Sequence, residues 1–165
     1  MKKNSVFIII PVHNRKATTL TCLERLQQNG ELARYSVVVV DDGSEDGTAD
    51  AIATDYPEVT VLQGDGNLWW TGAITKGMEY AYEQGANFFI WLNDDTLPEP
   101  ATIATLVEAC QQQPQTLVAA QCLSNTEPHI PSYGGQQRHF LALKPSHAAP
   151  YETLQCDALD GNLVC

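Results

Sequence analysis

Four short apolar runs divide the first two thirds of the chain. They cover residues 6–10, 37–40, 59–62 and 88–92. Each run is continuous and does not alternate with polar residues, which is typical of strands covered on both faces. The pattern therefore predicts four strands of a parallel sheet, with both faces of each strand buried.

The segments between these runs show the spacing of amphipathic helices, with apolar residues three and four positions apart. The predicted buried faces are Leu20, Leu23 and Leu26; Ala49, Ile52, Ala53 and Tyr56; Ile74, Met78, Ala81 and Tyr82; and Ile103, Leu106, Val107 and Cys110. Strands that alternate with helices imply right-handed crossovers. The first two thirds of the chain therefore predict an α/β fold, with a Rossmann-like, mostly parallel sheet flanked by helices.

The pattern changes after residue 117. The stretch "LVAAQCL" predicts a further strand, and it is followed by the turn-rich residues 124–137 and by an apolar run at 139–143. This order predicts hairpin-like additions beside the parallel core. The last residues, "LDGNLVC", have the pattern of a strand that is beginning, and domains seldom stop inside an apolar run. We therefore expect residues 1–165 to form one domain that is incomplete at its C-terminal end.

Composition narrows the classes of function. A length of 165 residues with 44% hydrophobic content suits one globular domain. No apolar run approaches the ~20 residues of a membrane span, and no signal-peptide core is present, so we expect a cytoplasmic protein. The formal charge of −11 argues against a nucleic acid as partner. Five cysteines without a Cys-x-x-Cys spacing predict reduced thiols.

The candidate chemistry follows the ends of the predicted strands. In open α/β sheets, ligands bind beyond the carboxyl ends of the strands. Residues 11–15, the pair Asp41 and Asp42, the glycine-rich residues 64–73 and the pair Asp94 and Asp95 come at those four ends. Four clustered carboxylates are costly unless a cation offsets their charge. Mg²⁺ or Mn²⁺ with a diphosphate would do so, because these ions bind one or two carboxylates together with phosphate oxygens.

Simpler interpretations of the same residues exist. The stretch "DDGSEDGT" could be a turn in which Asp46 or Thr48 caps the next helix, and "NDDTLPEP" could be a loop that leads into a helix near Pro100. His13 could be a structural histidine. Trp69 and Trp70 could be core or lid residues. The glycine spacing matches neither a phosphate-binding loop nor a dinucleotide fingerprint.

The four stretches together resemble a known family. "VFIIIPVHNR", "VVVVDDGSEDGT", "GNLWWTGAITKG" and "FFIWLNDDTLPEP" have the order and approximate spacing seen in the inverting nucleotide-sugar glycosyltransferases of family 2, which have the GT-A fold. The resemblance extends over residues 6–165. The Asn-Asp-Asp-Thr form and the third loop look most like the bacterial rhamnosyltransferase-like branch.

The resemblance implies a function. Such enzymes transfer a sugar from a nucleoside-diphosphate sugar to an acceptor hydroxyl with inversion, in the synthesis of cell-surface polysaccharides or glycans, and they use Mg²⁺ or Mn²⁺. The acceptor would be a glycan or a lipid-linked molecule. A cytoplasmic location would then include the inner face of the membrane.

The resemblance also assigns roles to residues of the predicted site. Asp42 would bind the nucleobase, Asp95 the metal, and Asp94 the ribose or a metal-bound water. The remaining implied contacts are Pro11, His13 and Asp41 at the nucleotide, and Asn67, Trp69 and Gly72 at the donor sugar or its loop. We expect Asp42→Ala to weaken nucleotide binding by roughly 1–3 kcal/mol and to change thermal stability little, because a turn at the rim of a sheet carries little packing.

Other residues depart from the family pattern or lie near its missing part. Asn93 stands where many members have aspartate, and Trp69 where many have glycine. The general base would lie beyond residue 165, while Asp157 and Asp160 would shape the acceptor side. We also expect exposed apolar surface at the end of the chain, around Leu163 and Val164, which would favour self-association.

Two functions of other classes share a similar sheet. A sugar-phosphate nucleotidyltransferase would need a glycine-rich basic loop after the first strand, where this chain has "PVHNRK". A phospho-receiver signalling module would need an acidic pair after the first strand and a lone aspartate after the third. Neither pattern is present.

Overall fold

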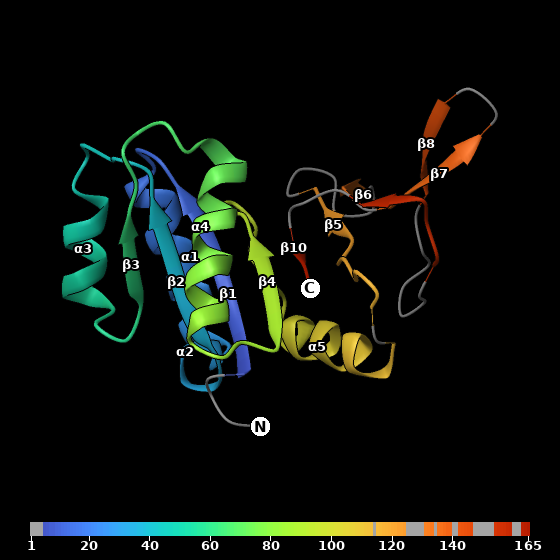
Figure 1. Cartoon of the computed structure of the whole chain (residues 1–165), viewed down its shortest axis with the longest axis horizontal. Helices are drawn as coiled ribbons and strands as arrows, with labels where there is room; N and C mark the ends of the chain where they lie inside the picture. Colours follow the sequence, from blue (N-terminus) through green and yellow to red (C-terminus); the bar gives the residue numbers. More distant parts are fainter. Residues whose placement is uncertain are drawn as a thin grey trace.

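A computed structural model of the chain describes residues 5–113, 115–124, 131–133, 135–139, 142–146, 154–159 and 163–165 (Figure 1). Its central sheet contains β1 (Val6–Val12), β2 (Ser36–Asp41), β3 (Thr60–Gln63), β4 (Phe88–Leu92) and β10 (Leu163–Val164). The order across the sheet is β10-β4-β1-β2-β3. Strands β1 to β4 are parallel and β10 is antiparallel, so the predicted mostly parallel sheet is confirmed.

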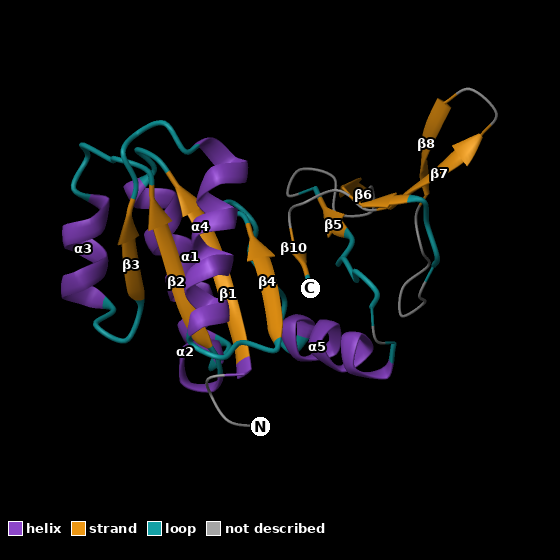
Figure 2. Cartoon of the chain, viewed as in Figure 1, coloured by secondary structure: helices purple, strands orange, loops and turns teal. Residues whose placement is uncertain are grey.

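Helices cover both faces of this sheet (Figure 2). They are α1 (Lys16–Gln28), α2 (Glu31–Arg34), α3 (Thr48–Asp55), α4 (Trp69–Glu83) and α5 (Thr102–Gln112). Alternate residues of β1 separate two hydrophobic clusters. Val6, Ile8 and Ile10 pack with buried residues of α1, α2, α3 and α5, whereas Phe7 and Ile9 pack with α4. The fold is thus a three-layer α/β arrangement, with α4 on one side of the sheet.

Helix α4 approaches the sheet closely at Gly77. A Cβ added there would lie 2.4 Å from Cγ2 of Ile9 and 3.2 Å from Cγ2 of Val40, and both of these residues are fully buried. Only glycine permits this spacing between the helix and the two central strands. The contact fixes the position of α4, and therefore of the loop that precedes it.

Three details of the predicted core are wrong. Ala53, on the predicted buried face of α3, is exposed. Strand β3 is the edge of the sheet and its residues are half-buried or exposed, so it is not covered on both faces. In α4, Ile74 and Ala81 are buried as predicted, but the buried stripe continues through Ala73 and Gly77, and Tyr82 is 75% exposed. The predicted face of α5, in contrast, is buried at all four positions.

The residues after 117 contain the hairpin-like additions that the pattern predicts. Strand β5 (Cys122–Leu123) pairs with β6 (Pro131–Tyr133), and β7 (Gly135–His139) pairs with β8 (Ala142–Ser146) and β9 (Ala158–Leu159), all antiparallel. The predicted strand over 117–123 is shorter than expected, because only Cys122 and Leu123 belong to a strand.

The last residues of the chain are buried, contrary to expectation. Strand β10 pairs with β4, and Leu163 and Val164 are 2% and 3% exposed. On its other side, Val118 and Cys165 exchange two backbone hydrogen bonds of 2.8 and 2.9 Å, and Ala120 donates to Leu163. The expected exposed apolar surface is therefore absent at these residues, and with it the reason that we gave for self-association.

Within the described residues, no helix combines the length and the apolar character needed to cross a bilayer.

Candidate functional site

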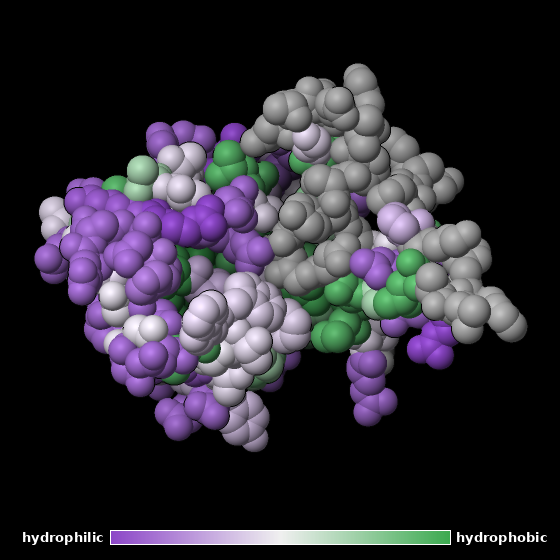
Figure 3. All heavy atoms as spheres, turned by 90° about the horizontal axis from the view of Figure 1, so that it is seen from above, coloured by the Kyte–Doolittle hydropathy of each residue, from purple (hydrophilic) through white to green (hydrophobic). Residues whose placement is uncertain are grey.

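A cavity of about 350 Å³ lies at the carboxyl ends of β1, β2 and β4. Its lining comes from the end of β1, from the loops that follow β1, β2, β3 and β4, and from the N-terminal part of α4. The lining residues are Pro11, Val12, His13, Arg15, Asp42, Gly66, Trp69, Trp70, Ala73, Asn93, Asp94 and Asp95. The two acidic pairs thus meet at one edge of the sheet, as expected, although Asp41 is not part of the lining. Figure 3 shows this edge from above, with hydrophilic residues gathered on the side of α3.

Asp42 is the anchor of the loop between β3 and α4. Its Oδ1 accepts the backbone N–H of Gly66 at 2.8 Å, and its Oδ2 accepts those of Leu68 and Trp69 at 2.9 and 3.0 Å. The residue is only 5% exposed. Burial raises the pKa of Asp42, but the three N–H donors together outweigh it and hold the pKa below its ordinary value. Asp42 is therefore an ionised group that is held in place by the loop.

Two glycines make this anchoring possible. A Cβ on Gly64 would lie 2.5 Å from Oδ1 of Asp42, and a Cβ on Gly43 would lie 3.0 Å from the nitrogen of Gly66. Gly43 also has a φ of +70°, which other residues rarely adopt. The glycines after β2 and β3 thus allow the backbones of these two loops to come close together around the carboxylate of Asp42.

The acidic turn after β2 also has the capping role that its composition suggests. Asp46 Oδ1 accepts the backbone N–H of Thr48 at the start of α3, and its Oδ2 accepts that of Lys16 at the start of α1. Asp41 Oδ1 accepts the N–H of Ser44, which closes the turn itself. Within "DDGSEDGT", Asp41 and Asp46 thus shape the backbone, and Asp42 alone faces the cavity.

His13 and Asn14 join the loops after β1 and β2. The backbone N–H of Asn14 donates to Ser44 Oγ, and Asn14 Oδ1 accepts the N–H of Glu45. His13 Nδ1 contacts the carbonyl oxygen of Asp42, and His13 Nε2 lies 3.0 Å from Asn14 Nδ2. Because a carbonyl can only accept, Nδ1 carries the proton and Nε2 accepts from Asn14. Both ring nitrogens are engaged, so the ring face is what His13 offers to a ligand.

Arg15 lies between the two carboxylates after β4. Its Nε is 3.3 Å from Asp94 Oδ2, and its Nη2 is 3.1 Å from Asp95 Oδ2. Asp94 is buried and also accepts a hydrogen bond of 3.2 Å from the hydroxyl of Thr19, whereas the side chain of Asp95 is 53% exposed. Burial raises the pKa of Asp94, and Arg15 and Thr19 oppose that rise. The guanidinium thus offsets the repulsion between the neighbouring carboxylates.

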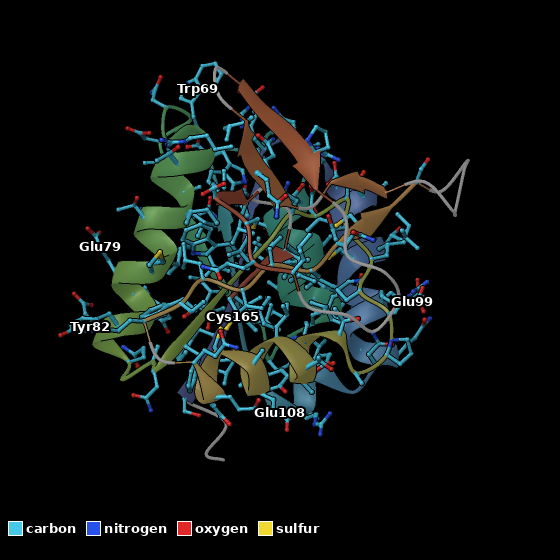
Figure 4. The ribbon with its side chains drawn as sticks, turned by 90° about the vertical axis from the view of Figure 1, so that its right-hand side faces the viewer. Trp69, Glu79, Tyr82, Glu99, Glu108 and Cys165 are labelled. Carbon is cyan, nitrogen blue, oxygen red and sulfur yellow. The ribbon has the colours of Figure 1, made fainter. Side chains whose placement is uncertain are left out.

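Two tryptophans form one wall of the cavity. Trp70 Nε1 donates to Asn93 Oδ1 at 2.8 Å, and its ring stands edge-on to Trp91 with centroids 6.0 Å apart. Trp69 is 81% exposed and projects from the first turn of α4 (Figure 4). Its φ is +55°, an unusual value for a bulky residue, in a backbone that Asp42 holds. Neither tryptophan is a core residue.

Other predicted site residues lie elsewhere. Asn67 and Gly72 belong to the same loop and helix but do not line the cavity. Asp157 Oδ2 accepts the backbone N–H of Arg138 in β7, so its position is in the C-terminal additions. Asp160 lies outside the described residues.

Residues 7–152 match the family described as "Glycosyl transferase family 2". The chain belongs to glycosyl transferase family 2.

One curated relative is the undecaprenyl-phosphate mannosyltransferase of Micrococcus luteus. It is 32% identical to this chain over 107 residues, which cover 63% of this chain and 43% of the relative. The undecaprenyl-phosphate 4-deoxy-4-formamido-L-arabinose transferase of Aeromonas hydrophila subsp. hydrophila is 32% identical over 118 residues, covering 65% of this chain and 34% of the relative. The family-2 chain therefore spans less than half the length of either relative.

A solved structure gives the same fold. The mannosyltransferase PcManGT from Pyrobaculum calidifontis, in complex with GDP-Man and Mn²⁺, superposes with a TM-score of 0.61 at 20% identity, covering 75% of this chain and 37% of that one. The predicted GT-A fold of the family-2 chain is confirmed by this likeness. The rhamnosyltransferase-like branch remains a prediction.

Sequence reasoning missed two side chains of this family-2 site. The sequence pattern places Arg15 and Asn14 only in the loop after the first strand, whereas in the structure Arg15 pairs with both acidic residues and Asn14 joins two loops. A signal for Arg15 was present, because residues 11–15 contain the one arginine at any predicted strand end.

Proposed function

We propose that the chain is the donor-binding part of a glycosyltransferase that takes a sugar from a nucleoside-diphosphate sugar. The observation that carries the proposal is the charge of the cavity. Asp42, Asp94 and Asp95 face one guanidinium, Arg15, so the lining has three formal negative charges against one positive charge, counting histidine as neutral. An anionic diphosphate enters such a cavity only with a further cation.

The residues fit a hard divalent cation that is shared with the ligand. Asp94 and Asp95 offer carboxylate oxygens side by side, and Arg15 already places a cation against both. In the part of the chain that the structure describes, no group of three or more acidic, histidine or cysteine side chains could enclose an ion. Mg²⁺ and Mn²⁺ need no such enclosure, since they bind through one or two carboxylates and complete their coordination with phosphate oxygens and water. Bound there, the ion would neutralise charge that develops on the departing diphosphate.

The nucleoside would lie on the side of Asp42 and His13. The two oxygens of a carboxylate offer about four acceptor positions, and three of those on Asp42 are taken by backbone N–H groups. One position is left for an N–H of the base. His13 offers its ring face for stacking, and Pro11 adds an apolar contact beside it. Asp42 and His13 are thus already oriented before the nucleotide arrives, which lowers the cost of binding.

The acceptor is the second part of the proposal. Both curated relatives carry names of undecaprenyl-phosphate sugar transferases, which supports a lipid-linked acceptor. The protein would then work in the cytoplasm at the inner face of the membrane, in glycan or polysaccharide synthesis. Family resemblance implies inversion at the sugar and a general base beyond residue 165, with Asp157 and Asp160 on the acceptor side. Membership of family 2 supports neither a nucleotidyltransferase nor a receiver module.

Calorimetric titration with nucleoside diphosphates tests the donor site. GDP, UDP and dTDP are each titrated into the chain in MnCl₂ and in EDTA. At least one should bind about tenfold or more tightly with manganese, because ion and diphosphate each improve the site for the other. Asp95→Asn should lose most of this gain, whereas Glu108→Gln, an exposed acid on α5, should keep it. Equal affinity with and without manganese for all three nucleotides would contradict the proposal.

A further inference from the structure

Arg15 occupies an unusual position in the cavity. It is the one lysine or arginine among the described lining residues, and its side chain is 45% exposed. Its Nε contacts buried Asp94 and its Nη2 contacts exposed Asp95, so a single guanidinium bridges two adjacent carboxylates. Each contact uses one oxygen, Oδ2, of a carboxylate to which a divalent cation could also bind.

The two carboxylates differ in how firmly they are held. Asp94 is 4% exposed and is also bound by the hydroxyl of Thr19, a fully buried residue of α1. The side chain of Asp95 is 53% exposed, and Arg15 is the partner that the structure gives it. Asp95 can therefore turn away from the guanidinium into the cavity with little cost in packing, whereas Asp94 cannot.

We propose that Arg15 is an exchangeable counter-ion, which pairs with Asp94 and Asp95 in the free protein and passes to the diphosphate when a divalent cation takes its place at Asp95. This inference rests on the proposed function, because it needs a metal–diphosphate as the ligand. It assigns to Arg15 a positioning role that neither the sequence pattern nor the family match contains.

The exchange makes metal and nucleotide depend on each other. A metal alone competes with a guanidinium for the same two carboxylates, and a diphosphate alone meets a guanidinium that is already paired. When both arrive, the metal frees Arg15, and Arg15 then binds phosphate oxygens through its planar set of donors. By linkage, the factor by which nucleotide strengthens metal binding equals the factor by which metal strengthens nucleotide binding.

Removal of Arg15 should change the two kinds of binding in opposite directions. In Arg15→Gln, Mn²⁺ alone should bind about three- to tenfold more tightly, because no guanidinium competes for Asp94 and Asp95. The complex of Mn²⁺ with nucleoside diphosphate should bind more weakly, since the phosphate loses a charged partner. Arg15→Lys should be intermediate, because an ammonium cannot bridge both carboxylates as a guanidinium does.

The experiment measures Mn²⁺ binding by electron paramagnetic resonance, with and without the diphosphate that binds best among GDP, UDP and dTDP. Arg25→Gln is the matched control, because Arg25 lies in α1, is not part of the cavity lining, and among the described residues forms one long ion pair, of 3.9 Å, with Glu99. It removes the same charge from the protein, and both of its affinities should stay as in the wild type. Thermal melts of all variants confirm that they are folded.

The outcomes separate the two proposals. Opposite changes in Arg15→Gln, with Arg25→Gln unchanged, support the exchange. If the wild type binds manganese–diphosphate but Arg15→Gln binds manganese alone no more tightly than the wild type, the exchange is overturned and the donor site stands. If the wild type binds no nucleoside diphosphate with manganese, both proposals fail.

Discussion

Replacement of Asp42 by alanine should destabilise the empty protein strongly. The substitution removes the acceptor of three backbone N–H groups, those of Gly66, Leu68 and Trp69. A hydrogen bond to a charged group contributes about 1.5–3 kcal/mol. Three such bonds would give about 4.5 kcal/mol at the lower end, and water that enters the open cavity would recover part of this. We therefore expect a loss of about 3 kcal/mol in the free energy of unfolding.

This expectation replaces the one made from the sequence, which assumed that a rim turn contributes little to stability. Urea unfolding followed by far-ultraviolet circular dichroism measures the change. Asp65→Ala is the matched control, because it removes a carboxylate from the same loop that accepts a single exposed N–H, that of Asn67. Its cost should stay below about 1 kcal/mol. Losses of equal size in the two variants would refute the anchoring role of Asp42.

The contribution of Asp42 to stability also depends on pH. The folded protein holds the pKa of Asp42 below its ordinary value of 3.8. A carboxyl with a lowered pKa contributes stability that is present above the unfolded pKa and is lost as the pH falls through the folded pKa. The difference in stability between the wild type and Asp42→Ala should therefore be constant near neutrality and should shrink below pH 3.8. A difference that stays constant under acid conditions would contradict this assignment.

Two further substitutions test the framework around the cavity. Gly77→Ala should lower stability by about 1–3 kcal/mol in a urea titration, although alanine favours helices, because its Cβ would meet buried Ile9; an unchanged midpoint would contradict the close packing of α4. Glu31→Gln should raise stability at pH 7 by about 1 kcal/mol, because Glu31 is 1% exposed and its Oε2 has no partner among the described residues. Burial raises the pKa of Glu31, and Arg34 opposes this rise, so the ionised form of Glu31 lowers stability as the pH rises. The gain in stability from Glu31→Gln should therefore vanish in acid, where Glu31 is protonated. A gain that persists in acid would contradict this account of Glu31.

The pattern of the sequence predicted the parallel sheet and its helices, because a strand that is buried on both faces appears in the sequence as a continuous apolar run. The runs at residues 6–10, 37–40 and 88–92 are strands, and the spacing in α5 identifies its buried face. The order of the strands and their position at the edge of the sheet are less evident from the sequence. Residues 59–62 are as apolar as the other runs, yet β3 lies at the edge, since its neighbours are set by tertiary contacts.

The candidate site was predictable in place but not in its contacts. The rule for the carboxyl ends of strands locates Asp42, Asp94 and Asp95 at one edge, and the cavity lies there. The partners of these carboxylates were not predictable, because they come from backbone N–H groups and from one arginine whose direction depends on the loop. The hydrogen bonds from backbone N–H groups to Asp42 are not encoded by any pattern of residue types. The same holds for the ion pairs by which Arg15 offsets the charge of Asp94 and Asp95.

The pairing of residues 118–120 with 163–165 has a consequence for how such a protein can change over evolutionary time. The two ends of the intervening stretch lie side by side, because Val118 and Ala120 bond to Cys165 and Leu163 on the side of β10 away from β4. A segment whose ends are fixed side by side can lengthen or shorten at a small entropic cost, which grows only with the logarithm of its length. The parallel sheet can therefore stay constant while the stretch between these ends changes in length or is replaced, and such a change need not disturb the cavity at the carboxyl ends of the strands.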